Sequence, residues 1–103
     1  MAIATDVEKK IQKLIQLAAK EIRLEAVYLF GSSAKGNAHK WSDIDLAIVS
    51  PDFIGDSFED SKKLFPHILA VDTAIESHTF RPVDFSSENP FVKEIQSTGI
   101  RVH

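Results

Sequence analysis

Two aspartates one position apart, Asp43 and Asp45, stand at the head of an apolar run that ends at Val49. Aspartate is depleted in β-strands, so a pair in this position suggests a chemical role. Residues i and i+2 of a strand project from the same face, roughly 6.6 Å apart, so both carboxylates can reach one cation. At an effective dielectric of about 20 the two charges repel by a few kcal/mol, which a divalent cation relieves. Mg²⁺ prefers carboxylates together with phosphate oxygens and water, which indicates a phosphate-bearing ligand.

A glycine and a serine, Gly31 and Ser32, directly follow another apolar run and could form the cradle for that phosphate. Glycine lets the backbone approach an anion, and a serine hydroxyl and neighbouring N–H groups donate to phosphate oxygens. A helical turn beginning at Ser33 would add its N-terminal dipole, and Lys35 could neutralise phosphate charge. Each residue also has a purely structural interpretation, as a strand end, a turn cap or a solvated surface lysine.

The elements before and around these motifs follow from apolar patterning. A stripe of apolar residues at helical spacing predicts an amphipathic helix from about residue 7 to 22, with Thr5 or Asp6 as its cap. A β-branched and aromatic run predicts a strand over 26–30, buried on both faces. The polar stretch 32–42 is typical of a loop. The run 43–49 favours a central strand whose first end opens at a cleft.

The second half of the chain predicts alternating elements of both kinds. In chain order, we expect a helix, a short strand, a turn-rich stretch and a last short helix, at residues 57–70, 74–77, 79–87 and 90–98. Pro66 predicts a kink or a helix boundary near Phe65, because proline removes a backbone hydrogen bond. Asn89 and Pro90 form an N-cap and N1 pair for the last helix, which Gly99 closes.

The composition of this 103-residue, 11.5 kDa chain is that of an ordinary globular domain, with 44% hydrophobic and 26% charged residues. We therefore expect one domain covering residues 1–103. A net charge of −3 provides no positive field for nucleic acids or anionic membranes, so neither is expected as a direct partner. No stretch approaches the ~20 apolar residues of a membrane span. The absence of cysteine excludes disulfides and cysteine metal sites, and fits a reducing cytoplasm.

The spacing of the two motifs resembles a known signature. Gly31-Ser32, ten residues, then Asp43-x-Asp45 is similar to the signature of the DNA polymerase beta nucleotidyltransferase superfamily. The fuller strings at 31–36 (Gly-Ser-Ser-Ala-Lys-Gly) and 42–49 (Ser-Asp-Ile-Asp-Leu-Ala-Ile-Val) resemble its minimal nucleotidyltransferase branch. The bare motif arises by chance in about one chain per thousand. The resemblance implies an α/β (α+β) fold of the palm-like nucleotidyltransferase type, a small mixed sheet flanked by helices.

The superfamily has a third carboxylate on a later strand, and the segment 75–78 (Ile-Glu-Ser-His) resembles that strand. The role then falls to Glu76, with Asp72 and Asp84 as alternatives. Members often carry proline where this chain has Ser77. Thirty-one positions separate Asp45 from Glu76, enough for a helical crossover and return. The four histidines, by contrast, show no spacing typical of metal ligands.

The resemblance also implies residue roles. The three acids would be catalytic residues and metal ligands that hold two Mg²⁺ ions, with Glu76 also accepting the proton of an attacking hydroxyl. The triphosphate, ATP by resemblance, would bind four residues of the loop after the first strand. The acids are Asp43, Asp45 and Glu76, and the loop residues are Gly31, Ser32, Ser33 and Lys35.

By the same resemblance, the chain would transfer a nucleotide monophosphate, AMP from ATP, to a hydroxyl acceptor. The larger enzymes of the superfamily add a helical domain for the acceptor, so a partner must supply that surface here. In the minimal branch the partner is a small helical HEPN protein, often an RNase toxin, whose tyrosine would receive AMP. The chain would then act as a cytoplasmic antitoxin in a hetero-oligomer, or form a homo-oligomer alone.

Two other functions fit parts of the pattern. The chain could be a non-catalytic or weakly catalytic binding module that neutralises its partner by occlusion and keeps the site for nucleotide sensing. Transfer to a small molecule such as an aminoglycoside is disfavoured because no second domain is expected. Aromatic residues in the C-terminal third, Phe80, Phe85 and Phe91, could form an oligomer surface but are more often core. Trp41 could stack on a base, or simply pack in the loop.

Overall fold

The computed structural model describes residues 3–31, 34 and 43–103. None of the helices within these ranges is long and apolar enough to cross a membrane. The elements, in chain order, are α1 (Thr5–Ala18), β1 (Ala26–Phe30), β2 (Ile44–Val49), α2 (Ser57–Val71), β3 (Ile75–Phe80), the 3₁₀ turn η1 (Pro82–Asp84), α3 (Pro90–Thr98) and β4 (Ile100–Arg101).

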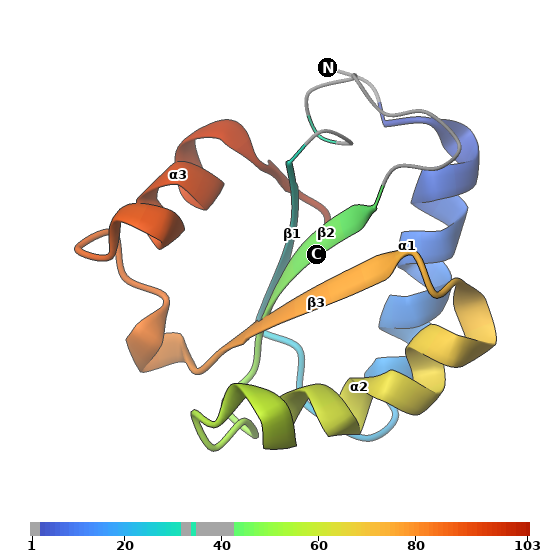
Figure 1. The fold of residues 1–103 in the computed structure, drawn as a ribbon, viewed down its shortest axis with the longest axis horizontal. Coiled ribbons are helices and arrows are strands. Elements are labelled where there is room, and N and C mark those ends of the chain that lie inside the picture. Colours follow the sequence, from blue (N-terminus) through green and yellow to red (C-terminus); the bar gives the residue numbers. More distant parts are fainter. Residues whose placement is uncertain (1–2, 32–33, 35–42) are drawn as a thin grey trace.

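A four-stranded mixed sheet forms the centre of the fold, in the order β3-β2-β1-β4 (Figure 1). β1 pairs antiparallel with β2 and with β4, whereas β2 and β3 run parallel. Parallel neighbours need a crossover connection, and α2 provides it. The expected α/β class, a small mixed sheet flanked by helices, is confirmed.

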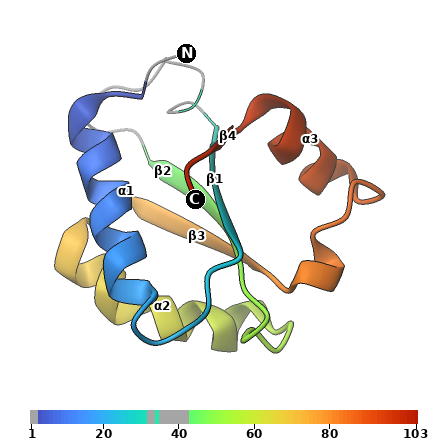
Figure 2. The same cartoon turned by 180° about the vertical axis from the view of Figure 1, so that it is seen from behind.

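The two faces of the sheet carry different layers. α1 and α2 pack against each other and cover one face, and α3 lies on the opposite side of the sheet (Figures 1 and 2). Apolar residues of α1, α2 and the strands form the main core, which includes Ile11, Leu14, Leu29, Leu46, Ile48, Leu64 and Ile68. Alternation along each strand therefore sends every second side chain into this core and the others towards α3.

The first helix is shorter than its apolar stripe predicts. It ends at Ala18, although Ile22, the last residue of the stripe, is still buried. The residue that precedes the helix is Ala4, which makes no side-chain cap, so the predicted caps at Thr5 and Asp6 were wrong. Asp6 instead lies in the first turn, where a negative charge faces the positive end of the helix dipole.

The second helix passes through its proline without a break. α2 is continuous from Ser57 to Val71 with Pro66 inside it, so the predicted boundary near Phe65 does not occur. Leu64 and Ile68 on either side of the proline are buried against the core, and this packing holds the helix together where one backbone hydrogen bond is lost.

Three strands differ from what the sequence predicts. β3 continues to Phe80, beyond the expected end at residue 77, because it pairs with β2 along its whole length, up to Val49 opposite Phe80. The two-residue β4 was not predicted, since a segment this short carries no pattern of its own. β1 was expected to be buried on both faces, yet Tyr28 and Phe30 are only half-buried.

Candidate functional site

The site begins where β1 ends, at Phe30 and Gly31. Gly31 has a φ of +77°, a left-handed conformation that glycine adopts without strain. A Cβ at this position would lie 2.7 Å from Oδ2 of Asp45, so a side chain here would displace that carboxylate. The Gly31 carbonyl accepts a hydrogen bond from the Ala34 N–H at 3.2 Å. Glycine is therefore favoured here by its positive φ, and its lack of a side chain leaves the Asp45 carboxylate in place.

The aspartate pair lies at the head of β2. Asp43 is exposed and directly precedes the strand, and Asp45 is half-buried within it. Asp45 lies opposite Phe30 of β1 on one side and Glu76 of β3 on the other. Paired residues of neighbouring strands project from the same face, so the register brings two carboxylates from different strands together.

Three side chains at this edge form one group of potential metal ligands. One ligand atom each from Asp45, Glu76 and His78 lie within 4.8 Å of one another. The His78 Nε2 atom is 3.4 Å from Oδ1 of Asp45. Asp43 lies outside this group of three, but its charge acts on Glu76.

Crowding of negative charge changes the electrostatics of Glu76. The pKa of its carboxyl is raised, chiefly by a side-chain hydrogen bond with Asp45 and then by the charge of Asp43. Such a shift means that the three acids disfavour full ionisation together. Carboxylate oxygens held close at this cost are the ligands that hard divalent cations use, so the residues present fit a divalent metal.

The two alternative third acids are engaged elsewhere. Asp72 forms an ion pair with Lys10 at 2.6 Å and accepts a hydrogen bond from the Ala74 N–H. Asp84 forms an ion pair with Arg81 at 2.6 Å. Of the three acids that the sequence offered for this position, Glu76 is the one that lies beside Asp45.

The structure places only some of the predicted site residues. Gly31, Asp45 and Glu76 come together, whereas Ser32, Ser33 and Lys35 lie outside the described residues, as does Trp41. Sequence reasoning missed His78. The signal was available in the same i, i+2 spacing that singled out the aspartates, because Glu76 and His78 are also one position apart on a strand.

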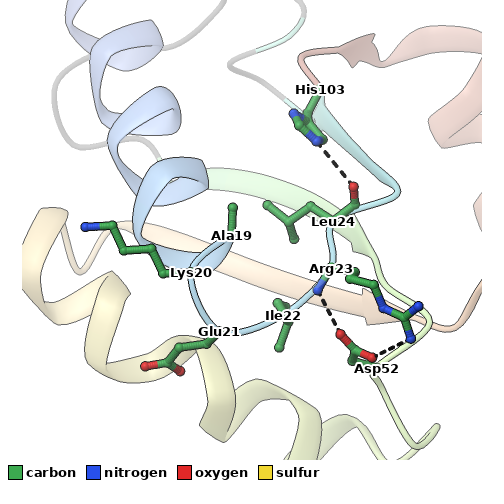
Figure 3. Close-up of a pocket in the computed structure, with 8 residues that line it drawn as sticks. All are labelled: Ala19, Lys20, Glu21, Ile22, Arg23, Leu24, Asp52 and His103. Carbon is green, nitrogen blue, oxygen red and sulfur yellow. Dashed lines mark hydrogen bonds and ion pairs between the residues drawn. The ribbon is translucent and has the colours of Figure 1, made fainter.

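A cavity lies at the end of the sheet opposite to Gly31 and Asp45, and it does not resemble a catalytic site. This cavity of about 480 Å³ is bordered by the turn between α1 and β1 (Figure 3). Two of its charged groups, Arg23 and Asp52, are paired with each other, since Asp52 accepts hydrogen bonds from the Arg23 backbone and guanidinium at 2.8 and 3.0 Å. The His103 ring lies 3.3 Å from the Leu24 carbonyl. These contacts hold the turn and the C-terminus in place.

The sheet edge that carries Asp43, Asp45 and Glu76 is called the acid edge below. Comparison with protein families identifies the family of the chain that carries it. The model described as "Polymerase beta, Nucleotidyltransferase" matches residues 12–103. The chain belongs to this nucleotidyltransferase family. Nucleotidyltransferases of this kind use a nucleoside triphosphate and a divalent metal, and the group at Asp45 supplies ligands suited to such a metal.

Solved structures support the same fold. A toxin–antitoxin crystallised with AMP-PNP is 25% identical, with a TM-score of 0.64, and the match covers 93% of this chain and 72% of that one. A Sulfolobus solfataricus protein provisionally described as a nucleotidyltransferase is 18% identical, with a TM-score of 0.62, over 98% and 89% of the two chains. A mutant of the toxin–antitoxin MntA-HpeT is 22% identical, with a TM-score of 0.63, over 93% and 72%. No curated protein shows a significant similarity to the chain.

Proposed function

We propose that this nucleotidyltransferase is a Mg²⁺-dependent enzyme that transfers AMP from ATP to a hydroxyl group. The acceptor is a tyrosine of a small helical partner of the HEPN type, which makes the chain an antitoxin. One observation carries the proposal: Asp45 and Glu76 lie opposite each other on parallel strands, directly beside the glycine that ends β1. A family member that has lost its chemistry would have no need to keep these carboxylates together.

In this proposal Asp43, Asp45 and Glu76 hold the metal. A divalent cation held by these residues would supply charge neutralisation for the phosphates and stabilisation of the leaving oxygen. Gly31 keeps the backbone at the end of β1 free of a side chain, so that phosphate oxygens can approach the acid edge. His78, 3.4 Å from Asp45, orients that carboxylate from the neighbouring strand.

The reaction is a displacement at the α-phosphorus. The acceptor oxygen forms a bond to this phosphorus while the bond to the bridging oxygen of the β-phosphate breaks, and pyrophosphate leaves with that electron pair. The hydroxyl proton passes to Glu76. The products are an adenylylated acceptor and pyrophosphate, and no covalent enzyme intermediate is formed.

The solved structure that is 25% identical to this chain supports the choice of ATP as the nucleotide and of a toxin as the partner. That structure is a toxin–antitoxin, and it was crystallised with AMP-PNP, an analogue of ATP. The acceptor of the present chain is accordingly sought in a protein encoded next to it.

A labelling experiment tests the proposal. The chain is incubated with ATP labelled on the α-phosphate, Mg²⁺ and the purified neighbouring protein, and we expect the label on a tyrosine of that protein. The double variant Asp43→Asn/Asp45→Asn and the variant Glu76→Gln should abolish labelling. Asp84→Asn is the matched control, because this acid is exposed and paired with Arg81, and it should label normally.

Two outcomes would contradict the enzyme assignment. Label that persists in the double aspartate variant would show that the acids do not perform the transfer. Tight binding of the neighbour without any label, together with neutralisation of its toxicity, would show that occlusion is the mechanism instead.

A further inference from the structure

An aromatic cluster borders the acid edge on the α3 side of the sheet. The rings of Phe30 and His78 lie 5.0 Å apart, and Phe91 at the start of α3 lies 5.6 Å from Phe30 and 5.9 Å from His78. Because the His78 ring also contacts the Asp45 carboxylate, the aromatic cluster lies directly beside the carboxylates. Aromatic surface and metal-binding oxygens are therefore immediate neighbours.

Phe91 is partly exposed although its helix packs against the sheet. The same helix buries Val92 and Ile95 completely against the sheet, whereas 45% of Phe91 remains exposed. The Phe91 ring lies against the half-buried ring of Phe30, so the two together offer contiguous aromatic surface to a ligand beside the carboxylates.

A cavity of about 230 Å³ opens between this ring and the end of β1. It is lined by Phe30, Gly31, Phe91, Glu94, Ile95 and Thr98. The Thr98 hydroxyl donates to the Glu94 backbone carbonyl at 2.8 Å, and the Glu94 carboxylate has no partner among the described residues. The cavity thus offers aromatic walls and one carboxylate that can accept hydrogen bonds.

We propose that this cavity binds the nucleoside part of the triphosphate. The base lies against Phe91 and Phe30, and Glu94 accepts hydrogen bonds from N–H or O–H groups of the nucleoside. This inference rests on the proposed function, because it takes the phosphates to lie at Gly31 and Asp45.

Three features of the cavity match a nucleoside. Gly31 belongs both to the cavity wall and to the edge where it contacts Asp45, so one ligand can extend from the carboxylates into the cavity. Every base presents a π-face on which an aromatic side chain can stack. Carboxylates accept hydrogen bonds from the amino groups of bases, which matches the unpaired carboxylate of Glu94.

The test compares two ligands that share the triphosphate and differ in the nucleoside. Dissociation constants are measured by calorimetry with Mg²⁺ for ATP and for inorganic triphosphate, on the full chain. Phe91→Ala should weaken ATP binding about tenfold, since stacking on one aromatic side chain contributes about that factor, and leave inorganic triphosphate binding unchanged. Phe91→Trp should preserve ATP binding. Phe58→Ala is the matched control, because Phe58 is 69% exposed on α2, on the other side of the sheet.

A second variant removes the hydrogen-bond acceptor. Glu94→Ala should weaken ATP binding several-fold without affecting inorganic triphosphate, and circular dichroism should show an intact fold for each variant. Glu88→Ala, an exposed glutamate in the loop before α3, serves as its control.

The possible failures are distinguishable. Normal ATP binding by both Phe91→Ala and Glu94→Ala would overturn the nucleoside site, while loss of both ligands in Asp45→Asn would leave the proposed function standing. Normal ATP binding combined with reduced transfer by Phe91→Ala would also overturn it, and would give the cavity to the acceptor side chain. Failure of the wild-type chain to bind either ligand would overturn the proposed function and this inference together.

Discussion

The two faces of the sheet show how one set of strands divides stability from chemistry. Under α1 and α2 the strand residues are apolar and fully buried, with Leu29 and Leu46 both 0% exposed. On the α3 side the same strands carry Asp45, Glu76 and a layer of half-buried aromatic rings. Neighbouring residues of one strand thus serve different purposes, and mutations at adjacent positions should have opposite signatures.

The sharpest test of this comparison pairs Leu46 with Asp45. Leu46→Ala should lower the free energy of unfolding by about 3 kcal/mol, because it leaves a cavity in the main core. Asp45→Asn should leave the free energy of unfolding unchanged or slightly higher, since it relieves repulsion with Glu76, yet abolish binding of Mg²⁺ with nucleotide. Urea unfolding and calorimetry measure the two properties.

The comparison fails if the signatures are mixed. A large loss of stability in Asp45→Asn would mean that the acid edge is part of the structural framework. Normal unfolding of Leu46→Ala would mean that the core on the α1 side tolerates a void.

A smaller effect is expected at the glycine that joins the two regions. Gly31→Ala should lower the free energy of unfolding by about 1–2 kcal/mol, because alanine is strained at positive φ. Its methyl group would also displace the Asp45 carboxylate, so Mg²⁺–nucleotide binding should weaken. Gly55→Ala is the matched control, with a φ of +94° near the other end of β2. It should lose similar stability and keep full binding; loss of binding in both variants would contradict the expectation.

The smallest effect concerns an ion pair on the structural side of the sheet. The hydrogen bond from Lys10 lowers the pKa of Asp72, so the pair's contribution is fully present above the ordinary aspartate pKa of about 4 and is lost as the pH falls below it. Lys10→Met should therefore flatten the fall in unfolding free energy between about pH 5 and pH 3. Lys9→Met, next to it on the exposed surface of α1, should leave the pH profile unchanged.

A steeper acid-induced loss in Lys10→Met than in the wild-type chain would contradict this linkage. Magnesium–nucleotide binding at neutral pH should be the same in both lysine variants, because the pair lies away from the acid edge. Chemical unfolding followed over the pH range gives the measurement.

Local patterns in the sequence were sufficient for the parts of the site that lie on one strand. The strand follows from its apolar run, and the Asp43-x-Asp45 spacing pointed to Asp45 within it, whereas Asp43 directly precedes the strand and lies outside the group of three potential ligands. Gly31 was identified by its place after β1, although its contact with Asp45 depends on the antiparallel pairing of β1 and β2.

Features that depend on pairing between distant strands were not accessible in the same way. The i, i+2 spacing places His78 on the same strand face as Glu76, but its meeting with Asp45 depends on the parallel register of β2 and β3, which no local pattern specifies. β3 outruns its predicted end for the same reason, since pairing with β2 overrides the turn signals after Ser77. The continuous α2 shows a third case, in which burial of Leu64 and Ile68 outweighs the helix-breaking tendency of Pro66.

The parallel pairing of β2 and β3 has a consequence for folding. Asp45 and Glu76 are separated by a long crossover, so they meet only after the intervening loop has closed. An ion shared between them would act as a reversible cross-link between distant stretches of chain and favour the native state by mass action. Completion of the tertiary structure and the ability to capture the ion would then be one event, and a partly folded chain would be inert.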